Sequence, residues 1–341
     1  MRVKVTTDWH IGAKRTAGAT PASNEALGAY LLQSLEKALD PQYPHLIMGD
    51  LLDQFTIDSA ALFSVYRVLQ SFLATGQELA VVRGNHDHHP RATQVSSFDL
   101  LMGILEHQFP ATLTVAREVT RWRQFVLVPH LPNNDLLKIE VEKLSDVENS
   151  VIVFHANYDN NFAADSQHAL NLTQEMADPL LKRGNVLTLG HEHQYRALEQ
   201  RRVLILGNGV PSSVADCLGC DAKFAAYFDG PDYELEPMVH INEVFTRVDW
   251  RNLDTDPGYQ FIRVEGTATA EEAAEVVDAV ARFRAKSEAY VVTNAVKVEG
   301  VAAFDDLAEM SLEQITSFNV LEALLAELTE DEGKVVKALL S

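Results

Sequence analysis

Short apolar runs alternate with helical patterns along the first two thirds of the chain. Apolar residues three and four positions apart predict helices over about 24–39 and 59–74. Runs rich in β-branched and apolar residues predict strands, namely VKVTT, HLIM, LAVVRG, FVLVP, SVIVF, NVLTL, RVLIL and AAYF. Strand–helix–strand repetition followed by a strand-rich half predicts an α/β layered domain with a mixed sheet over residues 1–240.

A second, smaller unit is predicted over residues 241–300. YQFIRVEG and AYVVTNAVKVEG each have the composition of a strand, and Thr269 and Glu272 between them form a capping box that opens a helix. A β-α-β unit of about 60 residues is too small to be comfortably stable alone, so we expect it to pack on the first domain.

The last segment, residues 301–341, is acidic and has apolar residues at helical spacing. Two interpretations stay open. The segment forms terminal helices that pack on their own domain, or it is an amphipathic segment that docks on a partner.

Composition limits the class of protein. With 47% hydrophobic and 23% charged residues, the chain can bury a full core. It has no signal-peptide pattern and no apolar run of about 18 residues, so we expect a soluble, cytoplasmic protein with no membrane partner. Cys217 and Cys220 form a single CxxC, which indicates structural thiols rather than a zinc site.

The net charge of −21 argues against nucleic-acid binding by the chain as a whole, because phosphates are repelled. A nucleic-acid function therefore needs local positive charge from clustered basic residues, bound metal or a partner. Lys14, Arg15 and Arg91 flank the loops discussed next, either as phosphate contacts or as solvated loop charges.

Side chains that can bind metal follow five of the predicted strands. They are Asp8 and His10 in TTDWHIG, Asp50 and Asp53 in IMGDLLD, Asn85, His86 and Asp87 in VVRGNHD, His155 in VIVFHAN, and His191 and His193 in TLGHEHQ. Ligands of α/β sheets gather outside the carboxyl ends of the strands, so these residues are predicted to form one site. His130 in LVPHLPN also ends a strand and could line the same cleft.

Carboxylate, imidazole and amide ligands without thiolate suit two divalent ions such as Mn²⁺, Fe²⁺ or Zn²⁺. Asp50 is the natural bridge between them, since a carboxylate can give one oxygen to each ion. Two such ions with Asp8 and Asp50 leave a charge of roughly +2, which can hold a phosphate and ionise a water for in-line attack. His86 follows Asn85 and should point toward the leaving oxygen, to stabilise or protonate it, with Asp87 or Asp53 orienting its ring.

DxH, GDxxD, GNHD, a single His and GHxH, in that order, resemble the calcineurin-like metallophosphoesterases over about residues 1–210. The resemblance implies a four-layer β-sandwich flanked by helices, with His86 as the catalytic histidine. It assigns one ion to Asp8, His10, Asp50 and His193, and the other to Asp50, Asn85, His155 and His191. Asp53 stands where the family often has a histidine, which leaves its role open.

The segment LILGNGVPSSVADCLGCDAKFAAYFDG is similar to the one that follows GHxH in SbcD-type DNA nucleases and their phage recombination counterparts. This implies a DNA exo/endonuclease subunit of a recombination or repair complex, using two divalent ions, most simply Mn²⁺. It further implies that residues 241–300 are a capping domain and that the 301–341 helices dock on an SMC-like coiled-coil ATPase (SbcC-type). Helices near 59–74 and 92–107 would form a homodimer.

Two other functions compete with this interpretation. One is a stand-alone phosphomonoesterase or small-molecule phosphodiesterase on the same site. The other is a metal-free scaffold, as in the retromer subunit of the superfamily. The complete ligand set counts against a scaffold, and the additional β-α-β unit with its helical tail favours the nuclease.

Overall fold

The computed structural model describes residues 1–14, 20–91, 94–160, 170–198, 200, 202–211, 223–238, 245–253, 261–286 and 291–298. The chain divides into two compact units. The first comprises Met1–Thr246, Pro257–Ile262 and Glu288–Val291, and the second Arg247–Asp256, Arg263–Ser287 and Val292–Ser341. The predicted boundary at residue 240 and the predicted helices of 301–341 lie outside the described residues.

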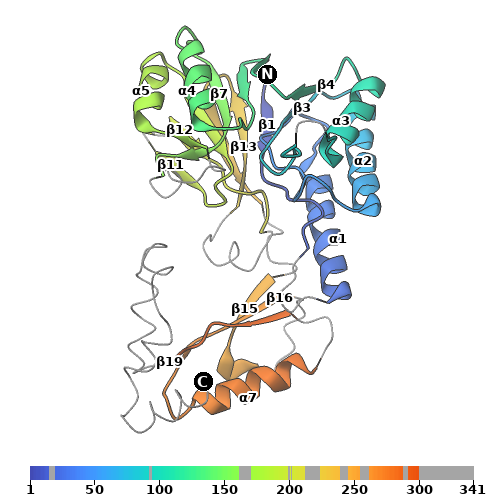
Figure 1. Ribbon diagram of the computed structural model, residues 1–341, viewed down its shortest axis with the longest axis vertical. Helices are drawn as coiled ribbons and strands as arrows, with labels where there is room; N and C mark the ends of the chain where they lie inside the picture. The colour runs from blue at the N-terminus through green and yellow to red at the C-terminus, as the bar shows by residue number, and fades with distance from the viewer. Residues whose placement is uncertain are drawn as a thin grey trace. The chain divides into compact units, whose positions relative to one another are not determined.

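One six-stranded sheet of the first unit has the order β14-β13-β1-β2-β3-β4 (Figure 1). Its strands are β1 (Val3–Thr6), β2 (His45–Ile47), β3 (Leu79–Val82), β4 (Leu113–Ala116), β13 (Phe224–Asp229) and β14 (Asp232–Pro237). Strands β1 to β4 are parallel to their neighbours, whereas β13 is antiparallel to β1 and to β14. The sheet is therefore mixed, as the sequence predicts.

A second six-stranded sheet has the order β11-β12-β10-β7-β6-β5. Its strands are β5 (Thr120–Trp122), β6 (Phe125–Val128), β7 (Val151–His155), β10 (Val186–Gly190), β11 (Arg196–Leu198) and β12 (Val203–Ile205). The four inner strands are parallel, and the edge strands β5 and β11 are antiparallel to their neighbours. A two-stranded pair, β8 (Asn157–Tyr158) and β9 (Asn171–Leu172), follows β7.

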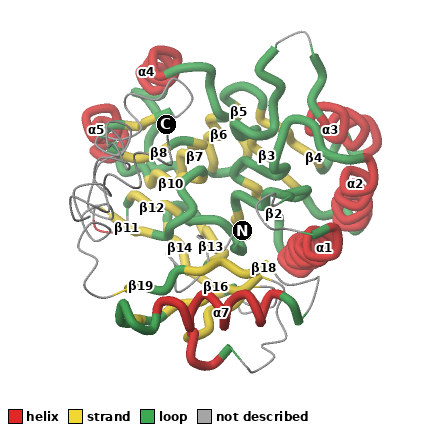
Figure 2. The backbone as a smooth tube through the Cα atoms, turned by 60° about the horizontal axis from the view of Figure 1, so that its bottom comes forward, coloured by secondary structure: helices red, strands yellow, loops and turns green. Residues whose placement is uncertain are grey.

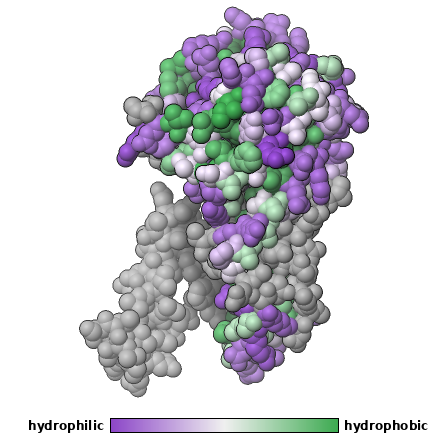
Figure 3. Space-filling model, turned by 90° about the vertical axis from the view of Figure 1, so that its right-hand side faces the viewer, coloured by the Kyte–Doolittle hydropathy of each residue, from purple (hydrophilic) through white to green (hydrophobic). Residues whose placement is uncertain are grey.

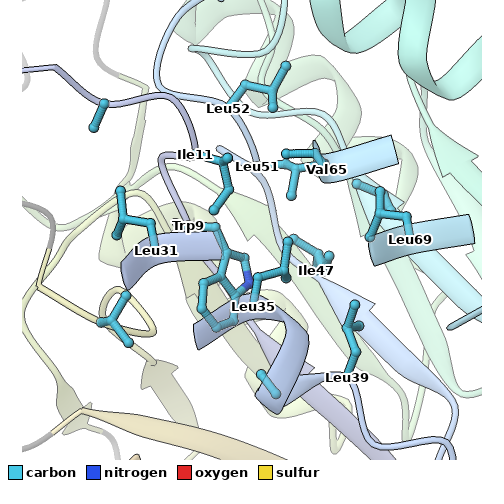
Figure 4. Packing of buried hydrophobic residues seen from close by; sticks show 14 of the residues in the cluster. Trp9, Ile11, Leu31, Leu35, Leu39, Ile47, Leu51, Leu52, Val65 and Leu69 are labelled. Carbon is cyan, nitrogen blue, oxygen red and sulfur yellow. The ribbon is translucent and has the colours of Figure 1, made fainter. Parts of the chain in front are cut away.

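Helices cover the outer face of each sheet, which gives four layers (Figure 2). The helices are α1 (Pro21–Ala38), α2 (Ser59–Ala74) and α3 (Ser97–Gln108) on the first sheet, and α4 (Asn134–Lys143) and α5 (Gln174–Lys182) on the second. Alternate strand residues face opposite layers: Leu46 packs between the sheets, whereas Ile47 packs under α1 and α2. Figure 4 shows the second kind of packing around Trp9, Leu35, Ile47 and Leu69. The predicted α/β sandwich flanked by helices is confirmed.

Capping side chains set the helix starts. Helix α1 begins three residues earlier than the apolar spacing predicts, because Thr20 and Ser23 form a reciprocal capping box. Helix α2 has the predicted bounds. Helix α3 was expected from about residue 92 but begins after Ser96, whose hydroxyl accepts a hydrogen bond from the Asp99 amide.

The remaining strands form two small sheets and carry one helix, α7 (Ala273–Arg284). One sheet has the order β15-β16-β18, and β17 pairs with β19. Their bounds are β15 (Phe245–Asp249), β16 (Phe261–Glu265), β17 (Thr267–Ala268), β18 (Val291–Asn294) and β19 (Lys297–Val298), with a 3₁₀ turn at Trp250–Asn252. The strand predicted over AYVVTNAVKVEG is divided into β18 and β19, and between them the Ala295 amide donates to the Val264 carbonyl of β16.

The predicted capping pair is present. The Thr269 amide donates to Glu272 Oε2 over 2.8 Å, and the Glu272 amide donates to Thr269 Oγ1 over 3.3 Å, just before α7 begins. Of the helices in the described ranges, none combines the length and apolarity needed to cross a bilayer.

Candidate metal centre

The loops that follow β1 and β2 run side by side and carry the first candidate ligands. The Asp8 amide donates to the Gly49 carbonyl over 3.1 Å, and the His10 amide donates to the Asp50 carbonyl over 3.0 Å. From the other sheet, the His191 amide donates to both carboxylate oxygens of Asp8, over 3.1 and 3.0 Å. Asp8 therefore joins the strand ends of the two sheets at one place.

Asp50 lies at the centre of the cluster. Its Oδ2 is 3.2 Å from His155 Nε2, 4.0 Å from His10 Nε2 and 4.0 Å from His86 Nε2. Its Oδ1 accepts a hydrogen bond from the His86 amide over 2.9 Å. The sequence interpretation gave one carboxylate oxygen to each ion, but here Oδ2 is the oxygen that faces both groups of histidines.

Two groups of side chains surround Asp50. In the first, Asp8, His10 and His193 converge, and the Nε2 atoms of the two histidines are 3.1 Å apart. In the second, Asn85 Oδ1 lies 2.9 Å from His155 Nε2 and 2.9 Å from His191 Nδ1. The structure thus brings together all seven predicted metal ligands, in the two sets that the family resemblance implies, and His86 forms a third group with His10 and Asp50.

The electrostatics of the cluster fit cations. Burial lowers the pKa of His10, but Asp53, Asp50 and Asp8 raise it more, to about 9. Burial likewise opposes protonation of His155, yet Asp50 and Asp8 raise the pKa to about 10. The carboxylates therefore create a negative field strong enough to hold protons on buried imidazoles, and a divalent ion would satisfy the same field.

Second partners orient the ligand rings. His155 Nδ1 donates to the Met48 carbonyl over 2.9 Å, so that Nε2 faces Asp50 and Asn85. His10 Nδ1 lies 3.3 Å from Asp53 Oδ1, which leaves Nε2 to face His193. Contacts of this kind fix the tautomer and orientation of metal-binding histidines. The Asp53 carboxylate accordingly supports a ligand.

His86 is more exposed than His10 and His155, since 41% of its side chain is accessible against 5% and 0%. Its Nδ1 donates to the Asp53 main-chain carbonyl over 2.5 Å, and its ring lies edge-on to His10. The ring is thus held from behind while Nε2 remains free to reach a substrate beside Asp50.

Asp87 has a different role from the one predicted. Its carboxylate is fully buried and accepts hydrogen bonds from the main-chain amides of Gly84, Leu52 and Leu51, over 2.9, 3.0 and 3.4 Å. Burial and the nearby Asp50 raise its pKa to about 7. Of the two acids considered for orienting His86, Asp53 does so through its carbonyl, and Asp87 instead ties two loops together.

The backbone of the site is strained. Asp8, His10, Asp50 and His191 have φ of 53°, 47°, 46° and 91°, in the region that L-residues seldom adopt. Gly84 is required for its lack of a side chain, because a Cβ there would collide with the Asp50 carboxylate. Such conformations persist only where the surrounding contacts enforce them, which is typical of functional sites.

Two supporting residues were not identified from the sequence. Thr7 Oγ1 donates to Asp8 Oδ2 over 2.5 Å. Glu192, which separates the two ligand histidines of GHEH, accepts hydrogen bonds from the Tyr158 amide and the Arg196 guanidinium, both over 2.7 Å. The signal for Glu192 was its position between two ligands in a turn.

The remaining predicted residues lie near the site or outside the described residues. His130 is buried, stacks on His88 and meets the edge of His155, with ring centroids 5.6 and 6.3 Å apart. It therefore lies against the candidate ligand His155, on a buried side of the ring. Lys14 forms an ion pair with Asp58 over 3.1 Å. The residues outside the described part of the chain are Arg15, Cys217 and Cys220.

A comparison with known proteins shows the family of the chain. The family described as calcineurin-like phosphoesterase matches residues 1–195. Similar solved structures include a dimetal phosphatase from Danio rerio, at 12% identity and a TM-score of 0.35, covering 70% of this chain and 96% of that one. A cold-active protein-tyrosine phosphatase of a psychrophilic Shewanella species has 11% identity and a TM-score of 0.35, covering 70% and 80%. Among curated proteins, none matches the sequence.

Proposed function

Because the chain belongs to the calcineurin-like phosphoesterase family, a family of metal-dependent hydrolases, we propose that it is a DNA exo/endonuclease that hydrolyses phosphodiester bonds with two divalent ions. The observation that supports hydrolysis most strongly is the convergence of two ligand groups on Asp50, with His86 exposed beside them. We further propose Mn²⁺ as the metal, on the resemblance to SbcD-type nucleases, from among the divalent ions that suit carboxylate, imidazole and amide ligands.

The residues divide the work as follows. Two bound divalent ions would neutralise the phosphate and lower the pKa of water near neutrality. Asp50 and the surrounding histidines would hold those ions, and Asp53 aligns both His10 and His86. His86 then hydrogen-bonds or protonates the leaving oxygen from its exposed Nε2.

Three features favour DNA over a small phosphoester. The segment after GHEH is similar to that of SbcD-type nucleases, a second unit follows the catalytic one, and the C-terminal segment has apolar residues at helical spacing. The net charge of −21 disfavours DNA at long range, so the bound ions must supply the local attraction.

We propose that two copies associate through α2 and α3. Phe63 on α2, and Leu100 and Ile104 on α3, are exposed large apolar residues on neighbouring helices. Figure 3 views the side on which these helices lie, and hydrophobic residues gather there within a mainly hydrophilic surface. Ile104→Glu should convert a dimer to a monomer by light scattering, whereas Leu136→Glu on α4 should not. A strictly monomeric wild-type chain contradicts the proposal.

The partner we propose is an SMC-like coiled-coil ATPase that binds residues 304–341. Deleting these residues should release the ATPase in co-purification while nuclease activity on single-stranded DNA is kept. Unchanged co-purification of the truncated chain would exclude docking through this segment.

The function is tested by incubating the chain and Mn²⁺ with labelled single-stranded DNA, labelled double-stranded DNA and a chromogenic phosphodiester. We expect cleavage of DNA and of the chromogenic substrate, and a strongly reduced rate for both in His86→Ala. Cleavage of the chromogenic substrate alone would favour a small-molecule phosphodiesterase or phosphomonoesterase, and no cleavage of any substrate would contradict hydrolysis.

A further inference from the structure

A buried lysine lies directly behind the candidate metal centre. Lys223 is 1% exposed, and its Nζ donates hydrogen bonds to the His193 main-chain carbonyl over 2.9 Å and to the Asn208 side-chain oxygen. Burying an ammonium group is costly unless its donors are satisfied. The burial of this lysine therefore indicates that the structure depends on the hydrogen bonds that it makes.

The segment that contains Asn208 also contacts two ligand-bearing loops. The Asn208 amide donates to the His193 carbonyl over 3.4 Å, and the Gly209 amide donates to the Thr7 carbonyl over 3.0 Å. Gly207, with φ of 76°, approaches so closely that a Cβ would lie 2.9 Å from the His193 carbonyl oxygen. Lys223 and this segment thus contact the main chain of His193 by two hydrogen bonds and close packing.

His193 depends on such support because it follows β10 in a turn and belongs to no regular element. Its carbonyl has two acceptor positions, and Lys223 Nζ and the Asn208 amide approach both. When this peptide is held in place, the position of the His193 imidazole is also restricted. That ring has its Nε2 atom 3.1 Å from Nε2 of His10.

We propose that Lys223 and Asn208 are positioning residues that hold His193 in place and thereby set the affinity of the ion site formed by Asp8, His10 and His193. The inference rests on the proposed function in that His193 must be a metal ligand. The proposal predicts an unequal effect on the two ions. Lys223 contacts the main chain of His193, which belongs to the first group, whereas His155 of the second group is held by Met48 and Asn85.

The test is Lys223→Met, which keeps an unbranched side chain one heavy atom shorter and removes the donors. Mn²⁺ binding is measured by calorimetry, and electron paramagnetic resonance distinguishes a coupled Mn²⁺ pair from isolated ions. We expect one of two sites to weaken ten- to hundredfold, the range found when outer contacts of metal ligands are removed. The spectrum at limiting Mn²⁺ should change from coupled to isolated.

Lys4→Met is the matched control. Lys4 is the other buried lysine of the described residues, but its ammonium lies 3.8 Å from Glu236 on the edge strand β14 and over the Tyr227 ring on β13. The Lys4→Met variant should bind two Mn²⁺ ions with the affinity of the wild type. An equal loss in both lysine variants would overturn the proposal, because the effect would then reflect general destabilisation.

Asn208→Ala provides a second variant, in case Lys223→Met does not fold. It should weaken the same site in the same direction, by less than Lys223→Met, because the lysine contact to His193 remains. Two sites of wild-type affinity in either folded variant would overturn the proposal while leaving the proposed function intact. Absence of Mn²⁺ binding in the wild type would contradict both.

Discussion

Two buried histidines in different regions of the first unit show what distinguishes a metal centre from the core. His155 and His45 are both fully enclosed, and burial lowers the pKa of each. The carboxylates of Asp50 and Asp8 reverse this effect at His155 and raise its pKa to about 10. Around His45, Lys4 adds to it, and the pKa falls to about 3. Charged neighbours, and not burial, therefore mark the region that attracts cations.

The same two histidines differ in their position along a strand. His45 is the first residue of β2, whereas His155 is the last residue of β7. The amino end of β2 places His45 under the helices, where Nε2 lies 2.8 Å from Thr6 Oγ1. The carboxyl end of β7 places His155 where the other ligands meet.

Asp50→Asn should have the largest effect, because it removes the charge that separates the two histidine environments. We expect Mn²⁺ affinity to fall by more than about a hundredfold, beyond the usual cost of an outer contact, and hydrolysis to become undetectable. Calorimetry and the phosphodiester assay measure this, with Asp58→Asn at the start of α2 as control. Two ions bound at wild-type affinity would contradict the role of Asp50.

His86→Ala should lower the rate of hydrolysis by about 10²- to 10⁴-fold while both ions still bind, because His86 acts on the substrate and the other histidines on the metal. Steady-state kinetics and metal analysis measure the two quantities separately. His107→Ala, an exposed histidine at the end of α3, should retain the wild-type rate. Loss of metal from His86→Ala would place this residue among the ligands instead.

Metal binding should tighten as pH rises. At pH 7 the metal-free chain holds protons on His10 and His155, because their pKa values of about 9 and about 10 lie above that pH. Both protons must leave before the imidazoles bind metal, so affinity should increase about a hundredfold per pH unit between pH 7 and 8. Calorimetry in buffers of different ionisation enthalpy should detect release of about two protons. Release near zero would contradict the raised pKa values.

His45→Leu should have the smallest effect and leave Mn²⁺ binding unchanged. Loss of the contact with Thr6 should lower the free energy of unfolding by about 1 kcal/mol at pH 7. Because the pKa of His45 falls to about 3 on folding, its neutral form stabilises the fold above pH 6.5, and that contribution is lost as pH falls toward 3. Urea unfolding should therefore be less sensitive to acid in the variant. Weakened metal binding would show that the two regions are coupled.

The motifs predicted which side chains come together, because each motif lies at a strand end and the hydrophobic pattern of the sequence shows where strands end. The sequence did not predict the roles of the supporting residues. Asp53 and Asp87 have the same side chain, yet one orients histidines and the other ties loops together, and only the path of the backbone separates them. Lys223 lies 30 residues beyond His193 in sequence, so nothing local connects them.

The most direct test of the central claim is an anomalous difference map from a crystal soaked in Mn²⁺. We predict two peaks about 3.5–4 Å apart, with Asp50 between them. Asp8, His10 and His193 should surround one peak, and Asn85, His155 and His191 the other. A map with no peak at Asp50, or with the two groups of ligands sharing no ions, would contradict the account.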